Sequence, residues 1–200
     1  RILGVLPFFH VFANATVLNR TIDNGGEIVM LPRFEATAAL KAVNRTKVTS
    51  MPGVPTMYQA LLDNAELPKT DFSSLRACIS GGAPLAAELK ARFEDVSHAA
   101  VIEGYGLTES SGVISCNPYE GTNKVGSIGQ PIPGTQVRLA DKEDPSKPAP
   151  VGEPGELLAK GPQIMAGYWN KPVATAEVFG DGWLRTGDVA TIDEDGFIFI

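Results

Sequence analysis

Short apolar runs alternate with longer amphipathic runs through the first 115 residues of the chain. Apolar runs bounded by turn residues are typical of buried strands, and they occur at residues 2–6, 27–31, 48–51, 77–80 and 100–102. Apolar residues spaced three or four positions apart predict helices between these runs, at residues 11–19, 37–44, 55–64 and 85–96. Alternating strands and helices predict an α/β fold with a parallel sheet that is flanked by helices.

The pattern changes after Asn117, where glycine and proline recur often. Residues 141–154 are charged and rich in proline, which predicts a loop without core residues. The remaining apolar runs are short and predict strands at residues 137–139, 156–159, 189–192 and 197–200, with one helix near residues 173–179. Residues 193–196 predict a hairpin turn, because Gly196 can take a positive φ. We therefore expect an α/β subdomain of residues 1–120, followed by a mostly antiparallel β subdomain of residues 121–200.

Composition restricts the classes of function. The chain has 200 residues, of which 44% are hydrophobic, and this suits a globular protein with one large or two small cores. A net charge of -6 disfavours binding to nucleic acid over a broad face. Cys78 and Cys116 are too few for a disulfide framework, and Cys78 is expected to be a buried, inert thiol. His10 and His98 lie far apart in the sequence, which disfavours a zinc site.

The segment of residues 103–109 combines four kinds of chemical group that suit a nucleotide and its metal ion. It contains one aromatic ring, two glycines, a hydroxyl and carboxylates, in the order Glu103, Gly104, Tyr105, Gly106, Leu107, Thr108 and Glu109. A predicted strand precedes it and a helix is expected to begin at Leu107, so it lies at a strand-to-helix turn, where open α/β sheets bind ligands. A helix start also presents free N–H groups to phosphate. Alternatively, the glycines form an ordinary turn and Glu109 interacts with the helix dipole.

Five motifs resemble, in order and spacing, those of the acyl-adenylate-forming enzymes, which are also called the AMP-binding superfamily. The motifs are residues 6–13, 80–85, 103–109, 155–157 with 161–169, and 182–189. Residues 9–13, 71–75, 117–119 and 161–163 look most like the corresponding segments of bacterial long-chain fatty-acid–CoA ligases. Such acid–thiol ligases activate a carboxylate with ATP, release pyrophosphate and transfer the acyl group from AMP to coenzyme A. The alternatives are a ligase for an aryl, medium-chain or amino acid, and a non-catalytic nucleotide-binding or scaffold relative.

The resemblance implies nucleotide-binding roles for nine residues, which are Gly82, Ala83, Pro84, Glu103, Gly104, Tyr105, Gly106, Thr108 and Asp188. Tyr105 would lie against one face of the adenine, and the backbone of residues 82–84 would lie on the other side. Asp188 would accept hydrogen bonds from the ribose hydroxyls. The residues alone favour a solvated turn aspartate at position 188, and they indicate a tight strand-to-helix turn at residues 81–84, which is compatible with a nucleotide-binding role.

The resemblance also implies catalytic roles for His10, Thr108 and Glu109. Thr108 would donate its hydroxyl to the α-phosphate, and Glu109 would bind Mg²⁺, which prefers carboxylate and water oxygens. His10 would lie near the substrate carboxylate and the entry of the pantetheine arm, although its spacing also fits a core histidine. Phe12, Ala13 and Val17 would line an acyl tunnel, or would face the core on an amphipathic helix.

The apolar runs at both ends of the chain predict that it is an internal fragment of a longer protein. The resemblance implies an upstream phosphate loop and a downstream C-terminal domain with a lysine that contacts the adenylate, and neither is present in the sequence. The resemblance also implies that the second subdomain is β-barrel-like. Because the phosphate loop and the lysine are missing, we expect the fragment to be inactive. The implied partners are a fatty acid, ATP, coenzyme A and the missing parts of the same polypeptide, without nucleic acid. The implied location is cytoplasmic, with peripheral contact at the inner face of the membrane left open.

Overall fold

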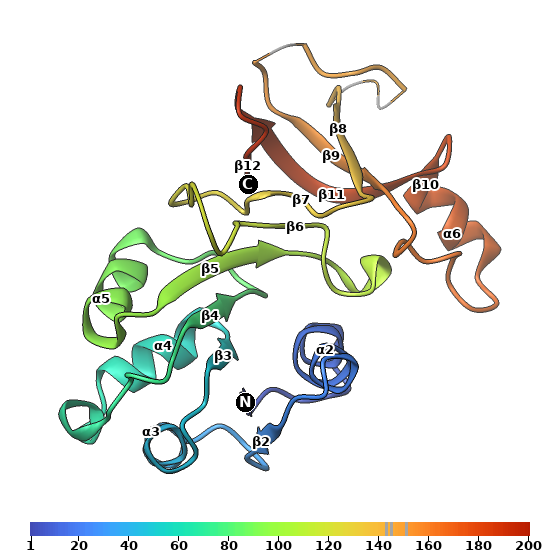
Figure 1. Cartoon of the computed structure of the whole chain (residues 1–200). Coiled ribbons are helices and arrows are strands. Elements are labelled where there is room, and N and C mark those ends of the chain that lie inside the picture. Colours follow the sequence, from blue (N-terminus) through green and yellow to red (C-terminus); the bar gives the residue numbers. More distant parts are fainter. Residues whose placement is uncertain (143, 145, 151) are drawn as a thin grey trace.

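The first of two sheets is built from the strands that the sequence pattern predicts, with two further short strands at its edge. In this computed structural model, which describes residues 1–142, 144, 146–150 and 152–200, its strands are β1 (Ile2–Gly4), β2 (Ile28–Met30), β3 (Ser50–Gly53), β4 (Ala77–Ser80), β5 (Ala100–Tyr105), β6 (Ser115–Cys116) and β7 (Gln130–Pro131). Their order is β2-β1-β3-β4-β5-β6-β7 (Figure 1). β1 to β5 are parallel, which confirms the prediction, whereas β6 and β7 pair antiparallel.

Helices cover both faces of this sheet (Figure 1). One face carries a continuous helical segment formed by α1 (Val11–Ala13), the π-helix η1 (Asn14–Asn19) and α2 (Arg20–Asp23). The other face carries α3 (Ala36–Thr46), α4 (Pro55–Leu62) and α5 (Ala87–Ser97), and the 3-10 turn η2 (Leu67–Lys69) follows α4. This helical segment extends beyond the predicted end at residue 19 to Asp23, and a turn follows in which Gly25 has a φ of 62°.

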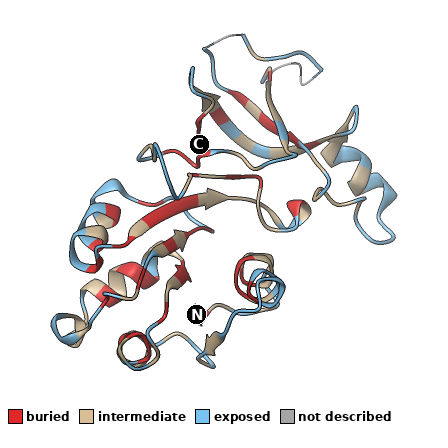
Figure 2. Ribbon diagram, viewed as in Figure 1, coloured by how far each residue is buried: buried red, intermediate tan, exposed pale blue. Residues whose placement is uncertain are grey.

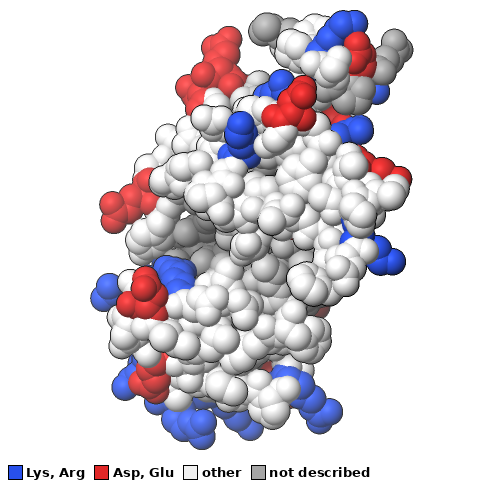
Figure 3. Space-filling view, turned by 90° about the vertical axis from the view of Figure 1, so that its right-hand side faces the viewer, with Lys and Arg blue, Asp and Glu red and all other residues white. Residues whose placement is uncertain are grey.

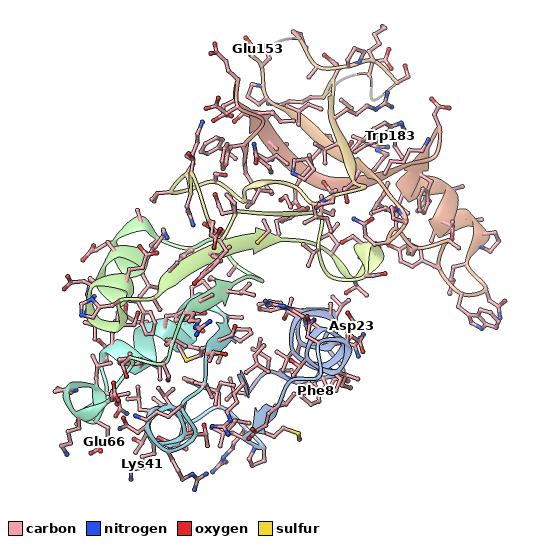
Figure 4. The ribbon with its side chains drawn as sticks, in the orientation of Figure 1. Phe8, Asp23, Lys41, Glu66, Glu153 and Trp183 are labelled. Carbon is pink, nitrogen blue, oxygen red and sulfur yellow. The ribbon has the colours of Figure 1, made fainter. Side chains whose placement is uncertain are left out.

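The two faces of the first sheet bury separate hydrophobic clusters. Successive strand residues point to opposite faces, and accordingly Leu3 packs in the large cluster with α3, α4 and α5, while Ile2 packs with Ala13 and Val17. Figure 4 shows Phe8 beside the helical segment of residues 11–23 that covers the second cluster. Figure 2 shows that the buried residues follow the central strands and the inner sides of the helices. Cys78 is fully buried, and burial raises the pKa of its thiol, so the expectation of a buried thiol is confirmed.

The second sheet is antiparallel, as expected. Its strands are β8 (Gln136–Ala140), β9 (Gly155–Lys160), β10 (Phe179–Gly180), β11 (Trp183–Ile192) and β12 (Ile198–Phe199), and α6 (Pro172–Val178) lies before β10. The order is β10-β11-β9-β8, with β12 paired to β11, and the sheet curls over the first sheet as a half-barrel (Figure 1). Trp183 lies at the end of this sheet beside β10 (Figure 4).

The predicted hairpin turn at residues 193–196 is confirmed, because the Asp193 N–H donates to the Phe197 carbonyl at 3.0 Å and Gly196 has a φ of 81°. The preceding strand is longer than predicted, and residues 183–188 belong to it rather than to a turn. Gly187, with a φ of 79°, accommodates a register shift between Arg185 and Val189, so the strand continues through a bulge.

The chain passes from the first sheet to the second between β7 and β8, and the two sheets also touch through backbone pairing. The Ile128 N–H donates to the Ile198 carbonyl and the Ile198 N–H donates to the Gly129 carbonyl, both at 2.9 Å. In the predicted loop at residues 141–154, positions 143, 145 and 151 lie outside the described residues. Division of the chain at residue 120 stays a prediction. Within the described part of the chain, no helix has the length and apolar character needed to cross a membrane.

Phe93→Ala should lower the free energy of unfolding by about 3–5 kcal/mol, because it deletes a buried ring and leaves a cavity. Phe93 has no exposed surface, and its ring meets Tyr58 edge-on at 5.0 Å and Phe72 at 6.0 Å between centroids. Urea unfolding followed by circular dichroism measures the change. Val96→Ala on the same helix, where the side chain is 39% exposed, is the control and should cost only about 0.5 kcal/mol. Equal losses in the two variants would contradict the assigned core.

Candidate functional site

A cavity of about 390 Å³ lies between the carboxyl ends of β4 and β5 and the facing side of β11, and we call it the cleft. Its volume lies within the range of about 300–1,000 Å³ that small-molecule sites occupy. The residues that line it include eight of the nine predicted nucleotide-binding residues, namely Gly82, Ala83, Pro84, Glu103, Gly104, Tyr105, Gly106 and Asp188. Leu85, Leu107, Gly126, Ile128 and Ile200 complete the lining. Residues from distant parts of the sequence therefore meet at the sheet edge where α/β folds bind ligands.

Tyr105 and Asp188 meet across this cleft. The Tyr105 hydroxyl donates a hydrogen bond to Asp188 Oδ2, which joins β5 of the first sheet to β11 of the second. Burial and the neighbouring Asp188 carboxylate raise the pKa of Tyr105, so the phenol keeps its proton and remains a donor. The Asp188 N–H donates to Thr186 Oγ1 at 3.1 Å, and that hydroxyl donates to the Leu157 carbonyl at 2.7 Å. Asp188 is thus half-buried and held toward the cleft, which differs from the alternative of a solvated turn aspartate.

Glu103 closes the inner wall of the cleft and also fixes the start of α5. Its Oε1 accepts the Leu85 N–H at 2.9 Å, and the helix begins two residues later, at Ala87, rather than at the predicted residue 85. Burial raises the pKa of Glu103, and the hydrogen bond from Leu85 and the charge of Lys90 partly offset this effect.

Lys90 and Glu94 form an ion pair behind this wall that was not predicted from the sequence. Lys90 Nζ donates to the Val101 carbonyl at 2.6 Å and to Glu94 Oε1 at 2.5 Å, while Glu94 Oε1 also accepts the Val101 N–H at 2.8 Å. The pair therefore ties α5 to β5 two residues before Glu103. Its four-residue spacing on a helix looks like an ordinary solvent-exposed ion pair, and only the burial of Lys90, which is 8% exposed, distinguishes it.

The segment after Tyr105 is a tight turn instead of the predicted helix. Only one 3-10 turn forms, η3 (Thr108–Ser110), because Ser111 takes a left-handed φ of 53° and the Gly112 N–H returns to the Leu107 carbonyl at 3.2 Å. A Cβ on Gly106 would lie 2.2 Å from the Gly112 carbonyl oxygen, so the returning chain excludes any side chain at residue 106. The predicted helix N-terminus is therefore absent, and this segment offers a ligand only side chains and the amides of a turn.

Thr108 and Glu109 lie on this turn beside the cleft. Thr108 is exposed, and Glu109 is half-buried with Oε1 accepting the Tyr168 hydroxyl at 2.7 Å. No group of three or more His, Cys, Asp or Glu side chains among the described residues could hold a metal ion. A single carboxylate beside the cleft still fits Mg²⁺, because this ion usually combines one or two carboxylates with water and substrate phosphates. Glu109 is therefore a residue of this site that could hold such an ion.

His10 is an exposed helix cap and does not belong to the core. Its Nδ1 accepts the Phe12 N–H at 3.1 Å at the start of α1. A Cβ on Gly81 would lie 3.4 Å from the Phe12 ring, so the segment that carries His10 abuts the turn next to Gly82. His10 itself does not line the cleft. Ala13 and Val17 are fully buried, as expected for a helix that faces the core.

Charged side chains are unevenly distributed over the surface. On the face drawn in Figure 3, Lys, Arg, Asp and Glu gather toward the upper and lower ends, and the wide area between them carries few charges. The cleft itself is lined by two carboxylates, Glu103 and Asp188, together with glycine backbone and apolar groups. Such a lining suits a ligand that offers hydrogen-bond donors and a flat ring.

Comparison with known proteins agrees with this geometry. The family model described as AMP-binding enzyme matches residues 1–169. The chain belongs to the AMP-binding enzyme family. It is 46% identical over 200 residues to a long-chain-fatty-acid–CoA ligase of Bacillus subtilis, with 100% of this chain and 36% of the relative covered. It is 42% identical over 201 residues to a feruloyl-CoA synthase of an Amycolatopsis species, with 100% of this chain and 40% of the relative covered.

Solved structures of this family share the fold. ATP-bound MatB from Rhodopseudomonas palustris is 34% identical with a TM-score of 0.91, and the match covers 100% of this chain and 39% of MatB. The anthranilate CoA ligase AuaEII in complex with anthranoyl-AMP is 29% identical with a TM-score of 0.90, and the match covers 100% of this chain and 38% of AuaEII. The chain thus spans less than half the length of these relatives.

The raised pKa of Glu103 predicts a pH-dependent effect of Glu103→Gln. The folded state binds this proton more tightly than the unfolded chain, so its contribution to stability is lost as pH rises from about 4.3, the unfolded pKa, through the higher folded pKa. The variant does not titrate, and its amide oxygen can still accept the Leu85 N–H. Its free energy of unfolding relative to the wild type should therefore increase as the pH rises from about 4 through the raised folded pKa of Glu103. Urea unfolding at several pH values measures this trend, and a pH-independent difference would contradict it.

Proposed function

We propose that the chain is the nucleotide-binding part of an ATP-dependent carboxylate–CoA ligase, with a long-chain fatty acid as its carboxylate substrate. The observation that carries the proposal is the cleft in which Tyr105 of the first sheet meets Asp188 of the second. A ring beside a carboxylate suits a nucleoside, because the base can stack on the phenol while the ribose hydroxyls donate to the acid. Gly82, Ala83 and Pro84 also line the cleft, and we expect their backbone to contact the other face of the base.

The proposed reaction has two steps. An oxygen of the substrate carboxylate attacks the α-phosphorus of ATP, the bond to the β-phosphate oxygen breaks, and pyrophosphate leaves. The thiol of coenzyme A then attacks the acyl carbonyl, loses its proton, and AMP leaves with the electrons of the broken acyl–oxygen bond. The first step brings negative charges together, so fixed donors and positive charge are needed at the phosphate.

Residues of the turn at 107–113 have proposed roles in the first step. Thr108 donates its hydroxyl to the α-phosphate, and Glu109 holds Mg²⁺. The metal ion, when bound, neutralises part of the phosphate charge. His10 acts near the substrate carboxylate, beside the turn at Gly81 that its helix abuts. The chain covers 36% of the length of the long-chain-fatty-acid–CoA ligase of Bacillus subtilis, and the phosphate loop and the lysine that the resemblance implies are not among these 200 residues, so we expect this chain alone to be inactive.

The sequence identity of 46% to a long-chain-fatty-acid–CoA ligase supports a fatty acid as the substrate. The sequence identity of 42% to a feruloyl-CoA synthase makes an aryl carboxylate the second candidate. Assay of the whole protein against fatty acids of graded length and against aromatic acids separates the two. Release of pyrophosphate that rises with chain length supports the first, and release only with aromatic acids supports the second.

Tyr105→Ala in the whole protein should weaken ATP binding by about 1–3 kcal/mol, since it removes the surface on which the base stacks. Isothermal titration calorimetry with ATP measures the change. Tyr119→Ala, at a tyrosine that is 52% exposed and does not line the cleft, is the control and should leave the affinity unchanged. Equal ATP affinities in the Tyr105→Ala variant and the wild type would remove the adenine assignment.

Glu109→Ala should suppress adenylate formation about 100-fold or more while leaving the affinity for the carboxylate almost unchanged, because it removes the proposed metal ligand. Carboxylate-dependent pyrophosphate release reports adenylate formation, and equilibrium binding reports the affinity for the carboxylate. A defect confined to carboxylate affinity would argue that Glu109 has no role at the metal ion.

A further inference from the structure

The loop of residues 161–168, between β9 and α6, lies against the turn that carries Glu109. Four hydrogen bonds join the two segments. They are Met165 N–H to the Glu109 carbonyl at 2.8 Å, Ser111 Oγ to the Gln163 carbonyl at 2.8 Å, Gln163 Nε2 to the Val113 carbonyl at 3.1 Å, and Tyr168 Oη to Glu109 Oε1 at 2.7 Å. The loop therefore holds both the backbone and the side chain of Glu109.

The Tyr168 end of this loop is itself anchored. The Tyr168 N–H donates to Thr175 Oγ1 at 2.9 Å, and that hydroxyl donates to the Lys171 carbonyl at 2.8 Å. Gly167 has a φ of 148°, and a Cβ there would lie 2.7 Å from the Thr175 side chain, so the backbone passes close to α6. The phenol consequently reaches Glu109 from a fixed backbone rather than from a free loop.

The contact leaves one carboxylate oxygen of Glu109 available. Oε1 accepts the Tyr168 hydroxyl, whereas no donor among the described residues bonds to Oε2. A glutamate side chain on an open turn samples several rotamers, and a hydrogen bond to one oxygen fixes the direction of the other. Oε2 is thus the oxygen that can bind a cation next to the exposed Thr108.

We infer that Tyr168 is a positioning residue, whose hydroxyl orients the Glu109 carboxylate for binding a divalent cation beside the nucleotide. This inference rests on the proposed function, since it assigns the cation site to Glu109. Tyr168 acts through Glu109 and does not touch the nucleotide cleft. The second sheet thereby contributes to the metal site through the loop after β9, in addition to its contribution of Asp188.

The test is Tyr168→Phe in the whole protein, which removes the hydroxyl and keeps the ring. The Mg²⁺ concentration that half-saturates ATP binding, measured by calorimetry without carboxylate, should rise about tenfold, which is the low end of the effect of residues that orient metal ligands. The same shift should appear in pyrophosphate release, with an unchanged KM for the carboxylate. Tyr119→Phe, the same substitution at an exposed tyrosine outside the site, should shift neither quantity.

A second variant separates positioning from a general structural role. In a Glu109→Gln background, Tyr168→Phe should add less than about a twofold further shift, since residues that act through one another are not additive. An unchanged Mg²⁺ dependence in Tyr168→Phe, or an equal shift in the Glu109→Gln background, would overturn the inference. A wild-type protein that releases no pyrophosphate with ATP and any carboxylate would instead overturn the proposed function, so the two failures are distinguishable.

Discussion

The position of Gly129 is the constraint on which the site depends. Its backbone passes between β6 and the paired end of β12, and a Cβ at this residue would lie 2.0 Å from the Cys116 carbonyl carbon. Glycine alone allows the chain to approach this closely, at a φ of 84°. The backbone bonds between Ile128–Gly129 and Ile198 then hold the second sheet over the carboxyl edge of the first. This contact helps to place Asp188 opposite Tyr105.

The cleft that results combines contributions from two different architectures. The parallel sheet supplies the glycine turn after β4 and the end of β5, where loops converge as in other α/β folds. The antiparallel sheet supplies Asp188 from a bulged strand. A nucleotide held between them would contact both sheets at once, so its binding should favour a fixed arrangement of the two.

Much of the fold could be predicted from the sequence, because apolar periodicity reports burial directly. The parallel strands and the helices that flank them follow from it, whereas β6 and β7 have only two residues each and give no periodic signal. The turn after Tyr105 was wrongly predicted as a helix, because a chain that doubles back at Gly112 is a tertiary feature. Tyr168 was missed for a similar reason, since its partner Glu109 lies on a distant segment, and Lys90 was missed because its burial against β5 has no signal in the sequence.

The most direct measurement is a crystal structure of the whole protein with bound AMP. We expect the adenine ring against Tyr105, with the backbone of residues 82–84 on its other side and the ribose hydroxyls within hydrogen-bond distance of Asp188. A nucleotide bound outside this cleft, or bound within it with Asp188 turned away from the ribose, would contradict the proposed nucleotide site.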